Sequence, residues 1–179
     1  MSEGRNTMPA GRELAVLRGV QTALSGRPPV VRAARALSLF GEHGAGWFAL
    51  GLVGAAADRR RRRQWLAASA GVLAAHGAAI AVKRVVRRPR PDDPQVQVLV
   101  GTPSRLSFPS SHAASTTAAA VLYGGLTRQP VAVSVIPPML VSRMVLGVHY
   151  PSDVVAGSVL GAAIGGVVLR WLRRERRVT

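Results

Sequence analysis

Hydrophobic residues in this chain fall in long runs that are separated by blocks of arginine. Within the second run, "AASAGVLAAHGAAIAV" has no polar face that a helix could turn toward water. Such runs are typical of membrane-crossing helices, although several are shorter than the roughly 20 residues that a full crossing needs. The five runs with almost no charge are 44–57, 64–82, 112–127, 130–146 and 152–170.

A weaker pattern occupies the N-terminal part of the chain. We expect residues 1–11 to be disordered and residues 12–25 to form an amphipathic helix at the membrane surface. In that helix the leucines share one face and the polar residues lie elsewhere, Leu14, Leu17 and Leu24 against Arg18 and Gln21. Residues 29–40 form either a second amphipathic piece or the start of a longer span that continues to Ala57.

Composition supports a membrane protein over a soluble nucleic-acid binder. The net charge is +16, but 48% of the residues are hydrophobic and the charge is concentrated in blocks such as Arg59–Arg63. Alternation of basic blocks with apolar runs indicates a polytopic membrane protein, and a soluble helix bundle is the less favoured alternative. We therefore predict an all-α bundle of about five to six transmembrane helices, with an N-terminal tail and interfacial helix over 1–28 and a membrane domain over 29–179.

Polar side chains that could take part in catalysis or ligand binding recur at the ends of the predicted spans. Lys83 ends one span, Ser110, Ser111 and His112 begin the next, and Arg143 lies near the end of the following one. In an up-and-down bundle these ends meet on one membrane face. The last span opens on the same face with His149 and Asp153.

This set of side chains suits phosphoryl transfer. Lysine and arginine neutralise and orient the oxygens of a phosphate, and the first N–H groups of a helix that starts near Ser110 point toward an anion. One histidine attacks phosphorus while the other protonates the leaving oxygen. Asp153 follows His149 by four residues, so its carboxylate can fix the tautomer of the attacking ring.

Three motifs carry a family resemblance. They read Lys-x6-Arg-Pro, Pro-Ser-Gly-His and Ser-Arg-x5-His-x3-Asp, in this order, and the sequence departs from them only where serine replaces the glycine. The matching residues are Lys83, Arg90 and Pro91; Pro109, Ser110, Ser111 and His112; and Ser142, Arg143, His149 and Asp153. The chain thus resembles the type 2 phosphatidic acid phosphatase family, which is related to the vanadium-dependent haloperoxidases.

The resemblance implies a role for each motif residue. His149 is expected to be the nucleophile, Asp153 its partner and His112 the general acid. The phosphate would be held by Lys83, Arg90, Ser110, Ser111 and Arg143. The family implies no metal and no cofactor, and Ser111 keeps the backbone N–H that the family uses while making the pocket tighter.

Further stretches, "GEHGAGW" and "VGTPSRLSFPSSHAASTTAAA", resemble the actinobacterial branch of decaprenylphosphoryl-5-phosphoribose phosphatases. The expected function is hydrolysis of a phosphomonoester or diphosphate of a polyprenyl-linked lipid through a phosphohistidine. Phosphatidic acid and undecaprenyl diphosphate are alternative substrates. Two other classes remain: a haloperoxidase, and a non-catalytic basic protein that binds anionic lipid or nucleic acid. We expect lipid and bilayer, and no nucleic acid, as partners; the oligomeric state stays open.

Other polar residues near the motifs are weaker candidates. Glu42 and His43 precede a span and are candidates for lining the substrate site. His76 is a further candidate, although the sequence more strongly indicates a buried structural histidine. Arg84, Arg87 and Arg88 either attract an anionic headgroup or anchor the helix at the interface.

Arginine distribution predicts the orientation. The face opposite the motifs carries eleven basic residues, including Arg59–Arg63, and the motif face carries seven. Because basic residues favour the cytoplasmic side, we expect a multi-pass protein of the inner (plasma) membrane with its active site on the extracytoplasmic face.

Overall fold

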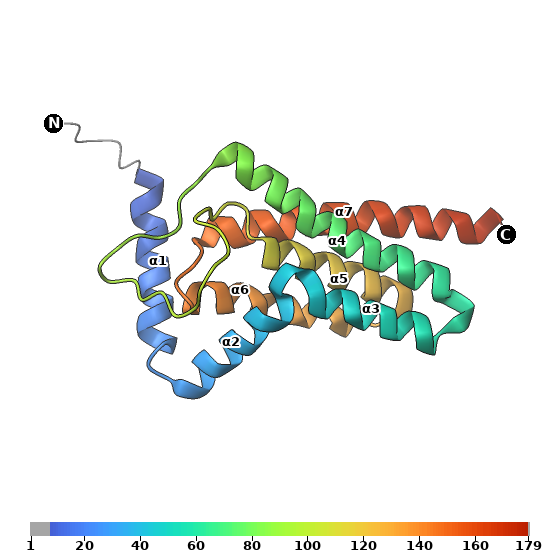
Figure 1. Cartoon of the computed structure of the whole chain (residues 1–179), viewed down its shortest axis with the longest axis horizontal. Helices are drawn as coiled ribbons and strands as arrows, with labels where there is room; N and C mark the ends of the chain where they lie inside the picture. The colour runs from blue at the N-terminus through green and yellow to red at the C-terminus, as the bar shows by residue number, and fades with distance from the viewer. Residues whose placement is uncertain (1–7, 179) are drawn as a thin grey trace.

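The computed structural model describes residues 8–178, and this part of the chain is helical apart from loops and one isolated β-bridge between Pro89 and Leu106 (Figure 1). The α-helices are α1 (Met8–Leu24), α2 (Pro28–Gly41), α3 (Ala45–Ala57), α4 (Arg62–Val86), α5 (Ser111–Thr127), α6 (Ile136–Val145) and α7 (Pro151–Val178). Short 3₁₀ segments are η1 (Glu42–Gly44), η2 (Arg59–Arg61) and η3 (Pro130–Val135). The predicted all-α class is confirmed.

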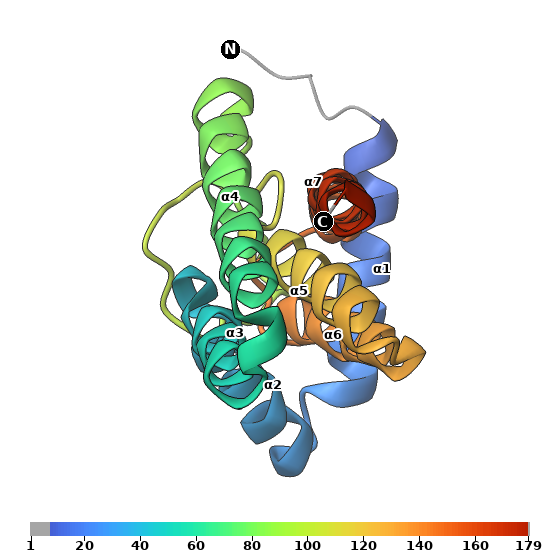
Figure 2. The same cartoon turned by 90° about the vertical axis from the view of Figure 1, so that its right-hand side faces the viewer.

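Helix α5 is the centre of the bundle, with α4 and α7 packed against it (Figure 2). Glycines make the approach of α7 very close: a Cβ on Gly157 would lie 2.3 Å from the carbonyl oxygen of Ser110, and one on Gly161 would lie 2.2 Å from that of Ala114. Small residues allow such backbone contact in membrane helices. The contact holds the start of α7, and the loop before it, against the start of α5.

The segment between residues 29 and 57 is two helices. His43 and Gly44 adopt positive φ values of 52° and 72°, which no α-helix contains. The chain therefore bends at η1, and α2 and α3 are separate elements. A single helix from residue 29 to Ala57 is therefore excluded. Of the two alternatives for residues 29–40, the structure has the separate piece, α2.

The segment predicted as one span over 130–146 is divided. Residues Pro130–Val135 form the 3₁₀ segment η3, and the α-helix α6 covers only Ile136–Val145. Pro137 and Pro138 stand at the start of α6, where a missing N–H costs no hydrogen bond. The prediction of a single helix was wrong here because these prolines start a new helix.

Helix α1 begins earlier than expected and uses its polar residues differently. Met8–Gly11 belong to the helix, so the predicted disorder is wrong for them, while residues 1–7 lie outside the described part. Gln21 is buried rather than turned to solvent: its side-chain amide donates to the carbonyl oxygens of Gln97 at 2.7 Å and Val145 at 3.0 Å. The helix contacts α6 and α7, and the division of domains at residue 28 stays a prediction.

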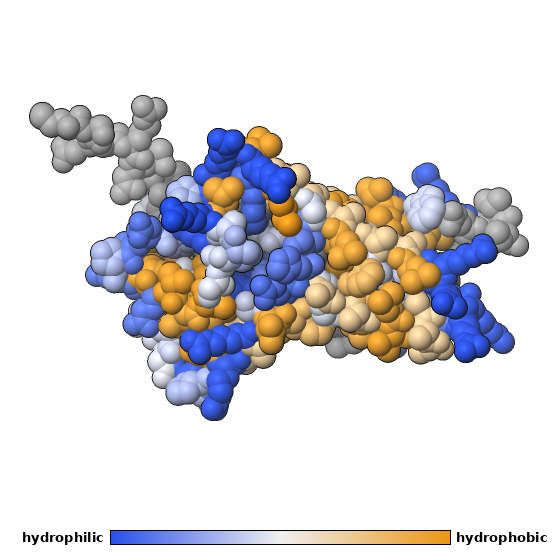
Figure 3. Space-filling model, in the orientation of Figure 1, coloured by the Kyte–Doolittle hydropathy of each residue, from blue (hydrophilic) through white to orange (hydrophobic). Residues whose placement is uncertain are grey.

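The face of the bundle in Figure 3 is largely apolar toward its middle and carries hydrophilic residues toward its ends. Exposed apolar side chains include Leu50 and Val53 on α3 and Val155, Val159 and Val167 on α7. Two helical stretches in the described chain, Arg59–Val86 and Pro151–Arg174, are long and apolar enough to cross a membrane. The expected five to six crossings are not confirmed, because the other apolar helices are shorter.

Candidate active site

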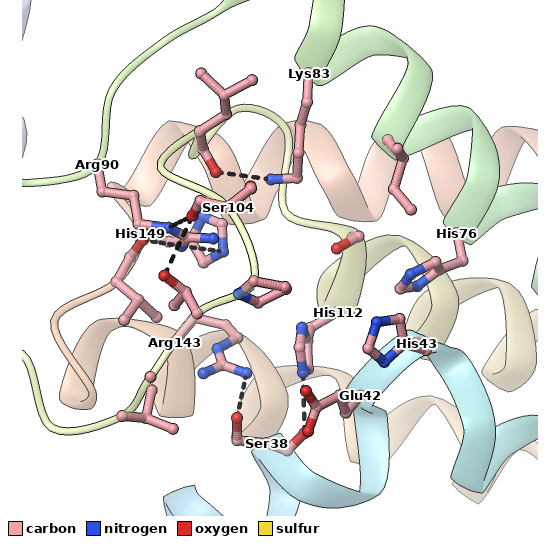
Figure 4. Close-up of a pocket in the computed structure, with 18 of the residues that line it drawn as sticks. Ser38, Glu42, His43, His76, Lys83, Arg90, Ser104, His112, Arg143 and His149 are labelled. Atoms are coloured by element: carbon pink, nitrogen blue, oxygen red, sulfur yellow. Dashed lines mark hydrogen bonds between the residues drawn. The ribbon is translucent and has the colours of Figure 1, made fainter.

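A pocket of about 360 Å³ opens where the helix ends meet (Figure 4). Its walls come from α2 and η1, from the end of α4, from the loop between α4 and α5, and from the start of α5 and the end of α6. The structure brings six of the motif residues to this pocket: Lys83, Arg90, Ser111, His112, Arg143 and His149.

The ring of His149 has two distinct neighbours. Its Nε2 lies 3.3 Å from Nη1 of Arg90, and its Nδ1 lies 3.4 Å from Oδ2 of Asp153. Because a guanidinium can only donate, Nε2 must be the accepting nitrogen, and the proton of the neutral ring then sits on Nδ1. This tautomer presents the Nε2 lone pair to the pocket, as a nucleophile requires.

Asp153 lies behind this histidine and is fully buried. The 3.4 Å contact with His149 is close enough for charge attraction, but Nδ1 is not aligned for a hydrogen bond. The carboxylate is instead fixed by the backbone N–H of Tyr150 on Oδ2 at 2.8 Å and by Arg88 on Oδ1 at 3.0 Å. Apo sites often show such loose contacts between catalytic groups, which tighten when substrate binds.

Three cations surround the pocket, of which Lys83 and Arg143 are buried and Arg90 is partly buried. Lys83, Arg90 and Arg143 make no ion pair with a carboxylate in the described part of the chain; Lys83 donates to the Ser107 carbonyl at 2.8 Å and Arg90 to the Val148 carbonyl at 2.6 Å. Arg143 is only 2% exposed, and its Nε has no partner. Buried charge without a counter-ion is costly, so the arrangement is suited to an anionic ligand.

Two serines begin helix α5. Ser110 is its N-cap, and its hydroxyl accepts from the N–H of Ala113 at 3.4 Å. The side chain of Ser110 is fully buried and is not part of the pocket wall, whereas Ser111 is. Ser111 and His112 of the first turn line the pocket, and the start of a helix, whose first N–H groups have no carbonyl partner in the helix, is a common anion-binding arrangement.

His112 projects from the first turn of α5 into the pocket. Its Nε2 lies 3.0 Å from the Ser38 carbonyl oxygen, which can only accept, so this nitrogen carries a proton. The other ring nitrogen, Nδ1, remains for exchange with a ligand. The same serine binds Arg143, whose Nη1 donates to the Ser38 hydroxyl at 3.0 Å.

Burial and the neighbouring cations change the acidity of His149. Desolvation, followed by the charges of Arg90, Lys83 and Arg143, lowers the pKa of His149 well below its ordinary value of 6.5. The ring is thus neutral at neutral pH, in the form that can attack phosphorus.

The weaker candidates also line the pocket. Glu42, His43 and His76 lie on its side toward α3, with the two imidazole rings 6.1 Å apart between centroids (Figure 4). Two polar wall residues on α2, Arg35 and Ser38, were not predicted from the sequence. No motif contains them, and only the bend at η1 brings α2 to the site. Within residues 8–178 no group of three His, Cys, Asp or Glu side chains is placed to hold a metal ion.

Comparison with known proteins agrees with this geometry. Residues 64–177 match the model of the PAP2 superfamily. The chain is 56% identical over 156 residues to decaprenylphosphoryl-5-phosphoribose phosphatase of Mycobacterium tuberculosis, covering 87% of this chain and 88% of that protein. It is 60% identical over 149 residues to the protein of that name from Mycolicibacterium smegmatis, covering 83% of this chain and 82% of the relative.

Solved structures share the fold at low sequence identity. The transmembrane PAP2-type phosphatidylglycerolphosphate phosphatase of Bacillus subtilis has a TM-score of 0.77 and 20% identity, with 95% of this chain and 88% of that chain covered. A bacterial vanadium-dependent iodoperoxidase has a TM-score of 0.72 and 16% identity, with 95% of this chain and 51% of that chain covered. Since the family model spans well over half of the sequence and the relatives cover most of it, the chain belongs to the PAP2 superfamily.

Proposed function

We propose that this protein hydrolyses the 5-phosphate of decaprenylphosphoryl-5-phosphoribose at a membrane surface. The observation that carries the proposal is the set of three buried or partly buried cations around two pocket histidines; none of the three cations is paired with a carboxylate among residues 8–178. The mycobacterial relatives that bear this name are 56% and 60% identical to the chain, which supports the particular substrate.

Phosphate binding is the task of the cations and the helix start. Lys83, Arg90 and Arg143 neutralise the oxygens of the bound phosphate, and the backbone N–H of Ser111 donates to one of them. Each cation has donors beyond those that the protein uses, including the unpartnered Nε of Arg143. Because the site is shielded from water, such donors stabilise the charge of the transition state strongly.

The first chemical step forms a phosphohistidine. Nε2 of His149 attacks phosphorus, and the bond between phosphorus and the ribose oxygen breaks. A substrate phosphate that binds as its monoanion brings a proton, which Nδ1 of His112 takes up and delivers to that oxygen, so the lipid leaves as an alcohol. Asp153 stabilises the positive charge that develops on His149.

The second step regenerates the enzyme. Water attacks the phosphohistidine, and Nδ1 of His112 takes the proton of the water and passes it to the departing phosphate. The P–N bond breaks, and Nε2 of His149 regains its lone pair. No oxidant or metal ion takes part in this sequence.

The pocket wall on the α2 and α3 side suits the sugar. Glu42 and His43 offer acceptors and donors that match ribose hydroxyls, and these two residues are the candidates for headgroup recognition. Leu39 and Ile80 border the same opening, and Leu39 is 75% exposed, which suits contact with a prenyl chain.

The proposed orientation places the pocket outside the cytoplasm, in an inner (plasma) membrane that the chain crosses several times. The sequence count of basic residues left out α1 and α2, whose arginines lie at the pocket end; Arg18 pairs with Asp93, and Arg35 donates to the Leu99 carbonyl. When the arginines of α1 and α2 are included, the pocket end and the opposite end of the bundle carry similar numbers of basic residues. The orientation is still supported by the basic residues that lie next to the two long apolar helices. The tract Arg59–Arg63 directly precedes the apolar part of α4, and the C-terminal arginines directly follow the apolar part of α7. Basic residues next to a membrane span favour the cytoplasmic side.

Released phosphate from a substrate panel tests the function. Purified protein in detergent with EDTA is given decaprenylphosphoryl-5-phosphoribose, phosphatidic acid or undecaprenyl diphosphate, with the His149→Ala variant as the blank. We expect the highest kcat/KM on the phosphoribosyl lipid. Faster turnover of phosphatidic acid or undecaprenyl diphosphate would reject the substrate while keeping the phosphatase.

A further inference from the structure

We propose that Glu13 on α1 and Arg88 in the loop after α4 are positioning residues that hold Asp153 behind His149. The inference rests on the proposed function, because it assigns these two residues to the same phosphohistidine chemistry. It gives the N-terminal helix a part in catalysis that neither its amphipathic pattern nor the motifs indicate.

Arg88 joins two carboxylates that are distant in sequence. Its Nη1 donates to Oδ1 of Asp153 at 3.0 Å and to the Ser152 hydroxyl at 2.6 Å, and its Nη2 pairs with Oε2 of Glu13. The guanidinium also stacks over the ring of Tyr150, 4.1 Å from its centroid. A planar guanidinium with several fixed partners has little freedom to move.

Glu13 contacts both Arg88 and the start of α7. Its Oε2 receives Arg88, and its Oε1 accepts the backbone N–H of Ser152 at 3.1 Å. That N–H belongs to the first turn of α7, where no carbonyl of the helix can accept it. Glu13 therefore fixes both the cation that binds Asp153 and the helix start that carries Asp153.

Contacts further along α1 keep Glu13 in place. Gln21 binds the backbone of Gln97 in both directions, with its amide donating at 2.7 Å and its Oε1 accepting at 3.0 Å. Arg18 pairs with Asp93 in the same loop. The register of α1 against the motif loop is thus set by polar contacts along the length of the helix.

Neither Glu13 nor Arg88 lines the pocket, so an effect on turnover must pass through Asp153. If the carboxylate turns away from Nδ1, His149 loses its orientation and the stabilisation of its charged form. Small displacements of a reacting group cost large factors in rate, whereas substrate affinity depends on the cations of the pocket. The network should therefore act on kcat and leave KM nearly unchanged.

The test compares Glu13→Gln, Arg88→Gln and the double variant with wild type, measuring kcat and KM on the phosphoribosyl lipid in detergent. Arg87→Gln is the matched control for Arg88→Gln, since it removes the same charge from an exposed neighbour. Arg12→Gln is the control for Glu13→Gln, since it changes α1 by one charge, of opposite sign, at an exposed neighbouring position. Arg88→Lys adds a variant that keeps the charge but loses the fork between two carboxylates.

We expect kcat to fall by roughly tenfold in both single variants with KM within about twofold, no change in the two controls, and only partial recovery in Arg88→Lys. The double variant should lose little more than Arg88→Gln alone, because residues acting in one network are not additive. If Glu13→Gln and Arg88→Gln keep the wild-type kcat while His149→Ala is inactive, the positioning role is overturned and the proposed function stands. A raised KM at unchanged kcat also overturns the positioning role, in favour of headgroup attraction by Arg88. Full activity in His149→Ala overturns the proposed function and this role together.

Discussion

Nη1 of Arg90 lies 3.3 Å from Nε2 of His149, which brings a permanent cation against the atom proposed to attack phosphorus. This contact keeps the ring neutral and its lone pair directed toward the pocket. When phosphate binds between them, the same guanidinium can hold an oxygen while the histidine approaches phosphorus. In the proposed mechanism, the pair thus joins substrate binding to activation of the nucleophile.

The first prediction concerns this pair and pH. Because burial and Arg90 lower the pKa of His149, protonation of the free enzyme should reduce kcat/KM only well below pH 6.5. In Arg90→Gln the loss of a nearby cation favours the imidazolium, so the acid limb should move to higher pH. Profiles of kcat/KM on one substrate measure the shift, since titration of the phosphate is then common to both enzymes. An acid limb at the same or lower pH in Arg90→Gln would contradict the assignment.

Substitutions of the proposed nucleophile, His149, and of its proposed partner, Asp153, should reduce the rate to different extents. His149→Ala is expected to abolish turnover, as are His112→Ala and Arg143→Ala, while Asp153→Asn should reduce kcat by roughly 100-fold or more because the amide cannot stabilise the charged ring. Released phosphate measures the rates, and size-exclusion elution checks the fold. Asp92→Asn is the matched control, as Asp92 is an exposed loop carboxylate. Comparable losses in the Asp92 variant would mean that the loop, and not the catalytic pair, is being perturbed.

Inhibition and metal dependence test the transition state. Vanadate adopts the five-coordinate geometry of phosphoryl transfer, so it should compete with substrate and bind more tightly than inorganic phosphate. EDTA should leave the rate unchanged. Activity that disappears with EDTA and returns only with Mg²⁺ or Zn²⁺ would demand a metal-assisted mechanism.

Close packing of α5 and α7 predicts an effect on stability. A methyl group on Gly161 would meet the Ala114 carbonyl oxygen at 2.2 Å, so Gly161→Ala should lower the free energy of unfolding by about 1–3 kcal/mol. Gly77→Ala is the control, because nothing lies within 4 Å of its Cβ position and alanine favours a helix. Thermal unfolding in detergent should show a lower midpoint for the first variant and an equal or higher one for the second. Equal midpoints for the two variants would contradict the close approach of the helices.

Single cysteines test the orientation. The natural chain has no cysteine, and both Arg60 in η2 and Gln95 in the loop are exposed. In intact cells, an impermeant maleimide should label Gln95→Cys and leave Arg60→Cys unlabelled until the membrane is opened. Labelling of position 60 alone would reverse the proposed topology and put the pocket in the cytoplasm.

The sequence by itself determined the helical class and the chemistry of the motifs. Apolar runs and arginine blocks predict helices, and the order and spacing of Lys83, His112 and His149 indicate phosphoryl transfer, because these signals lie within short stretches of chain. The prediction of helix ends near prolines was less accurate. The predicted span 130–146 is two elements in the structure, because Pro137 and Pro138 lie at the start of a new helix.

Only the tertiary structure decided which residues meet across the chain. The bend at His43 and Gly44 turns α2 so that Ser38 reaches both His112 and Arg143, and no local pattern predicts that contact. Glu13 reaches Arg88 across 75 positions, and Ser110 is committed to capping α5 rather than lining the pocket. Such outcomes follow from the packing of whole helices, in which burial and backbone contact between distant segments select one arrangement from the many that the same helices allow.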